Sequence, residues 1–269
     1  FFQSDKAFER FLRLMRHLKF PYKGKYVPYG IEQYLNEGVY EKIVSEYCEN
    51  LKVQVFKSAW LGRVNISRKI ISKFSQVIPF SNALLEDSYY VSPPEENEFC
   101  EFTGSFITDC FEGFKDSRKA DLVIDHTPSN IVHTNTILKF LPESKFIHIY
   151  RNPLDIISSF HSKDWGSRDL EINTCWIFDT LNQWFKHREV LNPTSFLEVK
   201  FEDLIANPEK ELNLICDFLR INESQEFYKV DLSKHNIGRW VDQISNEEAN
   251  MILTKYGNIF KKLGYKIDI

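Results

Sequence analysis

The residues best placed to bind an anion lie in the run FIHIYRNPLDIISS, residues 146–159. Its first five residues are hydrophobic enough for a strand that would present Arg151 at its carboxyl end, where open α/β sheets bind ligands. The guanidinium of Arg151 suits two-point binding of a phosphate, and Ser159 would offer a hydroxyl about two turns into a following helix. The spacing therefore predicts a phosphate site, although Arg151 paired with a carboxylate and Ser159 packed in a core would fit equally well.

A helix is expected to begin directly after Arg151. Asn152 is a preferred N-cap residue, and Pro153 suits the first helical position, where its missing N–H leaves no hydrogen bond unmade. Asp155 would fall in the first turn, where a negative charge is favourable beside the helix dipole. The N-terminus of this helix would attract an anion to the same place as Arg151.

Strands and helices alternate along most of the chain, which predicts an α/β fold with a mostly parallel sheet. Strands are expected at residues 52–56, 122–124, 146–150 and 196–201, and helices at 67–74, 153–160, 172–190, 207–219 and 245–264. Residues 79–120 are predicted to be irregular. Residues 1–50 are expected to form a separate helical N-terminal extension, and residues 51–269 a single three-layer domain with a central parallel sheet.

The run RNPLDIISSF, residues 151–160, resembles the 3′-phosphate-binding motif of sulfotransferases that use 3′-phosphoadenosine 5′-phosphosulfate (PAPS). In that motif an arginine and a serine eight positions later hold the 3′-phosphate, and Arg151 and Ser159 are in register with them. Residues 199–208 resemble the strand–helix element of the family, and residues 236–240 resemble the C-terminal loop that closes over the nucleotide, with Gly238 and Arg239 in it. The resemblance spans roughly residues 120–265. It implies a P-loop-like domain, PAPS as co-substrate, the desulfated product 3′-phosphoadenosine 5′-phosphate (PAP), and no metal.

The chain departs from the family at the loop that should cradle the 5′-phosphosulfate. The family's Gly-rich string, commonly PKSGTTW or PRSGTT, does not occur. The nearest counterpart is WLGRVNIS, residues 60–67, in which Gly62, Arg63 and Ser67 are the candidate phosphosulfate ligands. A register that uses Lys57 and Ser58, an ordinary strand-to-helix turn, and a deleted loop are the alternatives.

His126 is the first candidate for a general base. Sulfuryl transfer to an alcohol requires that the hydroxyl lose its proton as the nucleophile attacks. His126 stands two residues before Pro128, at the end of the predicted strand 122–124, and resembles the catalytic histidine of cytosolic sulfotransferases. An imidazole suits this role near neutral pH. The alternative is a histidine that caps an element or lies at the edge of the core.

The acidic run PPEENEF, residues 93–99, supplies a second candidate base. It resembles the acidic segment of bacterial and tyrosylprotein sulfotransferases in which a glutamate takes the proton, and Glu95 and Glu96 are the candidates here. A solvated acidic turn is at least as compatible with the run.

Composition excludes several other classes of protein. The formal net charge of −4 argues against a nucleic-acid partner, and five scattered cysteines predict reduced thiols rather than a disulfide framework. No apolar run reaches the roughly 20 residues that span a bilayer, and no signal peptide is visible, so a cytoplasmic protein is expected. The partner would be a small-molecule, carbohydrate or peptide acceptor.

Two rival functions fit part of the sequence. A non-catalytic relative that binds nucleotide or a partner protein would explain the missing Gly-rich loop. A P-loop kinase would share the strand–loop–helix architecture, but the string GxxxxGK[ST] that it needs is absent.

Overall fold

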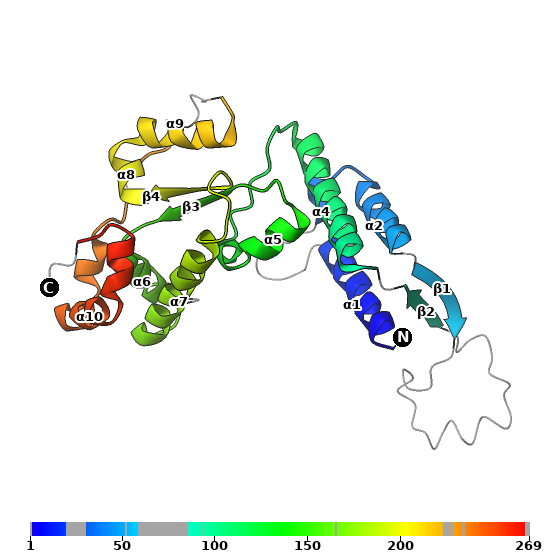
Figure 1. Cartoon of the computed structure of the whole chain (residues 1–269), viewed down its shortest axis with the longest axis horizontal. Helices are drawn as coiled ribbons and strands as arrows, with labels where there is room; N and C mark the ends of the chain where they lie inside the picture. The colour runs from blue at the N-terminus through cyan, green and yellow to red at the C-terminus, as the bar shows by residue number, and fades with distance from the viewer. Residues whose placement is uncertain are drawn as a thin grey trace, which may run out of the picture. The chain divides into compact units, whose positions relative to one another are not determined.

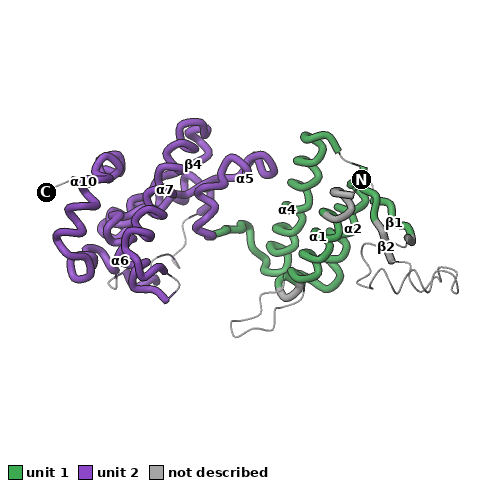
Figure 2. Tube along the Cα trace, turned by 90° about the horizontal axis from the view of Figure 1, so that it is seen from below, with its two compact units in different colours: residues 1–125 green, residues 126–269 purple. Residues whose placement is uncertain are grey.

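The computed structural model describes residues 2–19, 31–51, 53–58, 86–92, 94–164, 166–222, 227, 229–232 and 235–266. The chain divides into two compact units, residues 1–125 and 126–269 (Figure 2). The predicted division at residue 50 into an extension and a domain stays a prediction.

In the described part of the first unit, three α-helices pack around two small aromatic cores. Its elements are α1 (Phe2–Lys19), η1 (Ile31–Tyr34), α2 (Val39–Asn50), β1 (Val53–Ser58), β2 (Glu86–Val91) and α4 (Glu96–Arg118). The buried residues are Phe8, Tyr47 and Leu51 in one cluster and Met15, Leu35 and Tyr40 in the other. The helices expected before residue 50 and the strand expected near residue 52 are therefore confirmed. However, β1 pairs antiparallel with β2, so it is not a strand of a parallel sheet.

Helix α4 corrects the prediction that residues 79–120 are irregular. The helix begins at a capping box, in which the N–H of Glu95 donates to Glu98 Oε2 (3.2 Å). The acids of this run, for which a solvated turn was one alternative, thus fill the first turn of a helix, where negative charge is stabilising. Phe102, Phe106 and Cys110 then follow at helical spacing and face the cores or are buried.

The second unit contains a small parallel sheet among helices. Its elements are η3 (Pro128–Val132), α5 (Thr134–Phe140), β3 (Phe146–Tyr150), α6 (Pro153–His161), α7 (Leu170–Arg188), β4 (Phe196–Lys200), α8 (Phe201–Ala206), α9 (Pro208–Leu219), η5 (Arg239–Asp242) and α10 (Asn246–Lys262). β3 and β4 run parallel, with Phe146 opposite Phe196 and Tyr150 opposite Lys200. Figure 1 shows α8 and α9 on one side of this pair and α6, α7 and α10 on the other. The core between the latter helices includes Ile157, Phe178 and Phe260.

The predicted strand at residues 122–124 was wrong. These residues have no strand assignment, and their side chains Leu122 and Ile124 are 40% and 71% exposed. Three apolar residues favour a strand only where a neighbouring strand can pair with them, and in the described residues β3 pairs with β4 alone. The parallel sheet of the described residues accordingly has two strands, and His126 does not end a strand beside the one that leads to Arg151.

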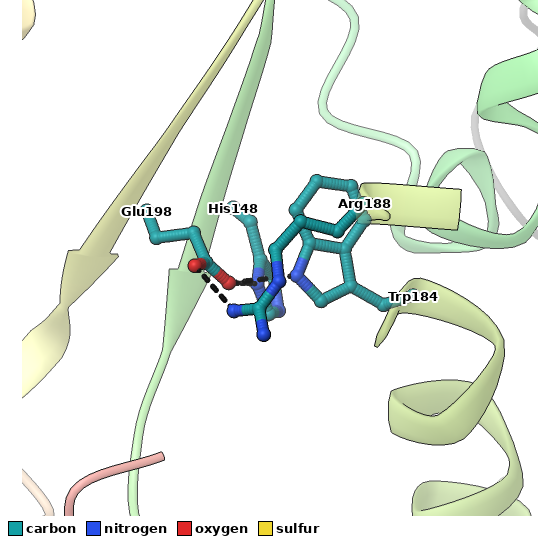
Figure 3. Close-up of polar contacts among 4 residues, drawn as sticks. All are labelled: His148, Trp184, Arg188 and Glu198. Atoms are coloured by element: carbon teal, nitrogen blue, oxygen red, sulfur yellow. Dashed lines mark hydrogen bonds and ion pairs between the residues drawn. The ribbon is translucent and has the colours of Figure 1, made fainter. Parts of the chain in front are cut away.

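A polar network ties the sheet to helix α7 (Figure 3). His148 and Glu198 are paired across β3 and β4, and Glu198 faces the helix. Trp184 Nε1 donates to Glu198 Oε1 (2.8 Å) and Arg188 Nη1 donates to Glu198 Oε2 (2.6 Å), while His148 Nδ1 lies 3.4 Å from Oε1. Burial alone would raise the pKa of Glu198, but these three hydrogen-bond partners lower it to about 2. The carboxylate therefore stabilises the folded unit.

Replacing Glu198 with glutamine is expected to lower the free energy of unfolding by about 1–3 kcal/mol at neutral pH, because Arg188 and Trp184 lose a charged acceptor. The folded pKa is below the ordinary value, so the carboxylate stabilises above about pH 4.5 and loses this effect as the pH falls toward 2. Denaturant unfolding at pH 7, 4 and 3 measures this difference. Glu189→Gln, an exposed acid at the end of α7, is the control. If the difference in unfolding free energy between the wild type and Glu198→Gln grows at low pH, the stabilising role of the Glu198 carboxylate is contradicted.

Candidate functional site

The turn from β3 into α6 has the predicted construction. Asn152 is the N-cap of α6 and its Oδ1 accepts from Leu154 N (3.0 Å), with Pro153 at the first helical position. The backbone N–H of Asn152 donates to Glu202 Oε1 (2.9 Å), and Tyr265 Oη donates to the other oxygen of that carboxylate (2.9 Å). Burial, followed by this hydrogen bond, raises the pKa of Tyr265. The turn that follows Arg151 is thus held both by the N-cap hydrogen bond of Asn152 and by the hydrogen bond to Glu202.

The side chain of Arg151 folds back along α6. Its Nη2 donates to the backbone carbonyl of Asp155 (2.7 Å). In an α-helix that same carbonyl accepts the N–H of the residue four positions later, which is Ser159. Arg151 therefore contacts the carbonyl toward which helix geometry directs the backbone N–H of Ser159. This bond uses one of the five N–H donors of the guanidinium and leaves its charge without a neutralising partner in that contact.

The two neighbouring serines of α6 differ in their surroundings. Ser158 is 2% exposed, and its hydroxyl is hydrogen-bonded to the side chain of Gln243. Ser159 is half-buried. The serine that is predicted to bind phosphate is thus the more accessible of the two, and its neighbour serves the protein's own packing.

The segment that contains Gly238 and Arg239 lies against the first turn of α6. The carboxylate of Asp155 is 3% exposed and accepts from Gly238 N (2.9 Å) at Oδ2 and from Trp240 N (3.1 Å) at Oδ1. Gly238 has φ of 77°, a left-handed conformation that favours glycine. The predicted closing segment is therefore docked on the same residue that Arg151 contacts.

Gln243 orients the exposed side chain of Arg239. With the amide placed so that its nitrogen donates to Ser158, its oxygen accepts from Arg239 Nε (3.1 Å) and Nη2 (3.2 Å). Two residues of α6 thus hold this segment. Asp155 binds its backbone N–H groups, and Ser158 binds Gln243, which in turn holds the guanidinium of Arg239.

The other candidate residues take part in none of the contacts described above for this site. His126 is exposed and directly precedes Thr127, the N-cap of η3. Glu95 and Glu96 begin α4 in the first unit, where Glu95 serves as the helix cap. The candidate phosphosulfate ligands lie outside the described residues; they are Gly62, Arg63 and Ser67. In the alternative register, the side chains of Lys57 and Ser58 also lie outside them.

Sequence reasoning missed the roles of Asp155, Ser158 and Gln243. Asp155 was assigned to the helix dipole alone, and the other two gave no local signal. Their partners lie 83 to 85 residues away along the chain. A buried acid within an otherwise apolar first turn was the one available hint, because a buried carboxylate needs hydrogen-bond donors.

Among the described residues, none of the helices is both long and apolar enough to cross a bilayer. The residues around α6 offer Arg151 just before its N-cap, the hydroxyl of Ser159 in its second half, and Arg239 on the segment that contacts its first turn. This donor set suits a doubly charged phosphate.

Known sulfotransferases resemble this chain in sequence and structure. A solved sulfotransferase domain from the curacin biosynthetic pathway has a TM-score of 0.44 and 14% identity, and the match covers 88% of this chain and 83% of that domain. One from the Synechococcus PCC 7002 olefin synthase has a TM-score of 0.43 and 18% identity, with 61% and 70% covered.

The sequence comparisons are more specific. The chain is 23% identical over 167 residues to the omega-hydroxy-beta-dihydromenaquinone-9 sulfotransferase Stf3 of Mycobacterium bovis; the match covers 55% of this chain. It covers 42% of that relative, so the chain spans less than half of its length. A sequence profile of the sulfotransferase family matches residues 74–225, more than half of the chain, and includes Arg151 and Ser159. The chain belongs to the sulfotransferase family.

Proposed function

We propose that this protein transfers a sulfuryl group from PAPS to the hydroxyl, or the amine, of an acceptor by in-line displacement. The observation that carries the proposal is that Asp155 accepts from Arg151 at its carbonyl and from Gly238 at its carboxylate, so that the predicted phosphate-binding arginine and the Gly238–Arg239 segment contact one residue. Family membership supports the reaction class.

In this proposal Arg151 and Ser159 bind the 3′-phosphate through charge-assisted and hydroxyl hydrogen bonds. Gly238 and Arg239 close over the nucleotide, and Gly62, Arg63 and Ser67 hold the 5′-phosphosulfate. We also propose that the whole domain has the three-layer P-loop-like fold with a central parallel sheet.

His126 is proposed to take the proton of the acceptor hydroxyl as that oxygen attacks the sulfur, with Glu95 or Glu96 as the alternative base. Its exposure leaves the imidazole open to an acceptor. The acceptor is proposed to be a small molecule with a hydroxyl, because the mycobacterial relative is named for a hydroxylated one. Carbohydrate and peptide acceptors remain alternatives, and the cytoplasm is the proposed location.

A non-catalytic nucleotide-binding protein is the second candidate, and the missing Gly-rich string favours it. Incubation of the full chain with labelled PAPS and a panel of acceptors separates the two. The proposed function predicts a labelled sulfated product, whereas the second candidate predicts that PAP binds and no acceptor is labelled. Binding of ATP with Mg²⁺ in preference to PAP would instead indicate a kinase.

Replacing Arg239 with alanine is expected to weaken PAP binding about 10-fold and leave the protein folded, because the side chain is exposed and bonded to Gln243 alone among the contacts described above. Calorimetric titration and thermal unfolding measure the two effects. Arg220→Gly, at an exposed left-handed C-cap of α9, is a control that should bind PAP normally. A lower melting temperature with unchanged affinity would show that Arg239 serves structure.

A further inference from the structure

Asp155 connects the two halves of the proposed nucleotide site. Its carbonyl accepts from Arg151 Nη2 (2.7 Å), and its carboxylate accepts from the N–H groups of Gly238 (2.9 Å) and Trp240 (3.1 Å). These partners come from segments more than 80 residues apart. The residue is 3% exposed, so water does not compete for these hydrogen bonds.

The carboxylate holds a conformation that the segment would not keep by itself. Gly238 is left-handed, with φ of 77°, and among the described residues no atom other than those of its chain neighbours lies within 4 Å of the position a Cβ would take, so packing at that position does not fix its conformation. Two N–H groups converge on one carboxylate, which a short loop achieves only in a narrow range of backbone angles. Asp155 therefore selects this conformation of residues 238–240.

The position of Arg239 depends on this selection. Its backbone lies between the two N–H groups that Asp155 binds, and its guanidinium is held by Gln243, which is bonded to Ser158 on the next turn of α6. If the backbone of residues 238–240 left Asp155, the guanidinium would lose its fixed relation to Arg151.

We propose that Asp155 is a positioning residue that holds Arg239 in register with Arg151, so that both cations act on one nucleotide. This inference rests on the proposed function, because it assumes that Arg239 contributes to nucleotide affinity. It assigns to Asp155 no contact with the nucleotide itself.

The test is a double-mutant cycle with Asp155→Asn and Arg239→Ala in the full chain, read by calorimetric titration with PAP. Asparagine keeps one acceptor oxygen and the volume of the side chain, but it turns an NH₂ group toward a backbone N–H. We expect Asp155→Asn to weaken PAP binding about 3- to 10-fold, no more than the loss of Arg239 itself. In that background Arg239→Ala should weaken it less than about 3-fold further, against about 10-fold in the wild type, because coupled residues are not additive. Asp179→Asn, an exposed acid on α7, is the matched control.

Hydrogen exchange distinguishes positioning from loss of fold. In Asp155→Asn, the amides of Gly238 and Trp240 should exchange at least about 10-fold faster, while the amides of Ile252 and Phe260 in α10 stay protected. Should Asp155→Asn not fold, Gly238→Ala strains the same conformation from the other side and should also remove most of the effect of Arg239→Ala.

The outcomes separate the inference from the proposed function. Additive effects of the two substitutions, with PAP bound by the wild type, overturn the inference and leave the proposed function standing. Faster exchange throughout α10 overturns it as well, since Asp155 would then serve global stability. A wild-type chain that does not bind PAP overturns both.

Discussion

Replacing His126 with alanine is expected to lower turnover about 10²- to 10⁴-fold, the usual contribution of a general base, with little change in PAP affinity. Steady-state rates with labelled PAPS measure the loss of turnover, and calorimetric titration with PAP measures the affinity. His133→Ala, an exposed histidine seven residues along the chain, is the matched control and should keep near-full activity.

The acidic run provides the outcome that would contradict this assignment. If His126→Ala keeps near-full activity while Glu96→Ala loses it, the base lies at the start of α4. Glu95 caps that helix, so its replacement is expected to cost about 0.5–2 kcal/mol of stability besides any effect on rate. Thermal unfolding must therefore accompany the rates for the Glu95 variant.

Replacing Arg151 with alanine should weaken PAP binding by roughly 10- to 150-fold, which corresponds to about 1.5–3 kcal/mol for a charge-assisted contact. Affinity for adenosine 5′-phosphosulfate should barely change, because this ligand lacks the 3′-phosphate. The single hydrogen bond described for Arg151 goes to Asp155 in the helix that directly follows it, so the fold should survive. Titration with both ligands measures the difference.

Arg168→Ala is the control for the loss of a positive charge, since Arg168 is exposed and paired with Asp164. Equal weakening of both nucleotides by Arg151→Ala would indicate a folding defect. Unchanged binding of both would remove Arg151 from the site.

The elements that the sequence predicted correctly are those whose signals are local. The strand 146–150 is found with the predicted bounds, and Asn152 and Pro153 begin the next helix as expected. The Ser245–Glu248 capping box opens α10. Each of these signals involves residues within four positions of one another, so the sequence carries them in full.

The errors arose where a tertiary partner decides the structure. Residues 122–124 have the composition of a strand, but among the described residues no strand pairs with them, and their backbone is irregular. The prediction that residues 79–120 are irregular was wrong from residue 96 to residue 118, because the acids that follow the two prolines suit the N-terminus of a helix.

The site was predictable in its parts and not in its connections. Arg151 directly precedes the N-cap of the helix that carries Ser159, so a single local run was enough to predict both as phosphate ligands. The contact of Asp155 with Gly238 joins residues 83 positions apart, and nothing in either local sequence specifies the other. The pairing of Ser158 with Gln243 could not be predicted for the same reason, because these residues are 85 positions apart.

Calorimetric titration of the full chain with PAP, with ATP and Mg²⁺ as the comparison, tests the central claim most directly. The site around α6 predicts saturable binding of one PAP per chain, tighter than that of adenosine 5′-phosphosulfate and much tighter than that of ATP with Mg²⁺. Binding that is absent, or that does not depend on the 3′-phosphate, would contradict the assignment of Arg151, Ser159 and the Gly238–Arg239 segment to a PAPS site.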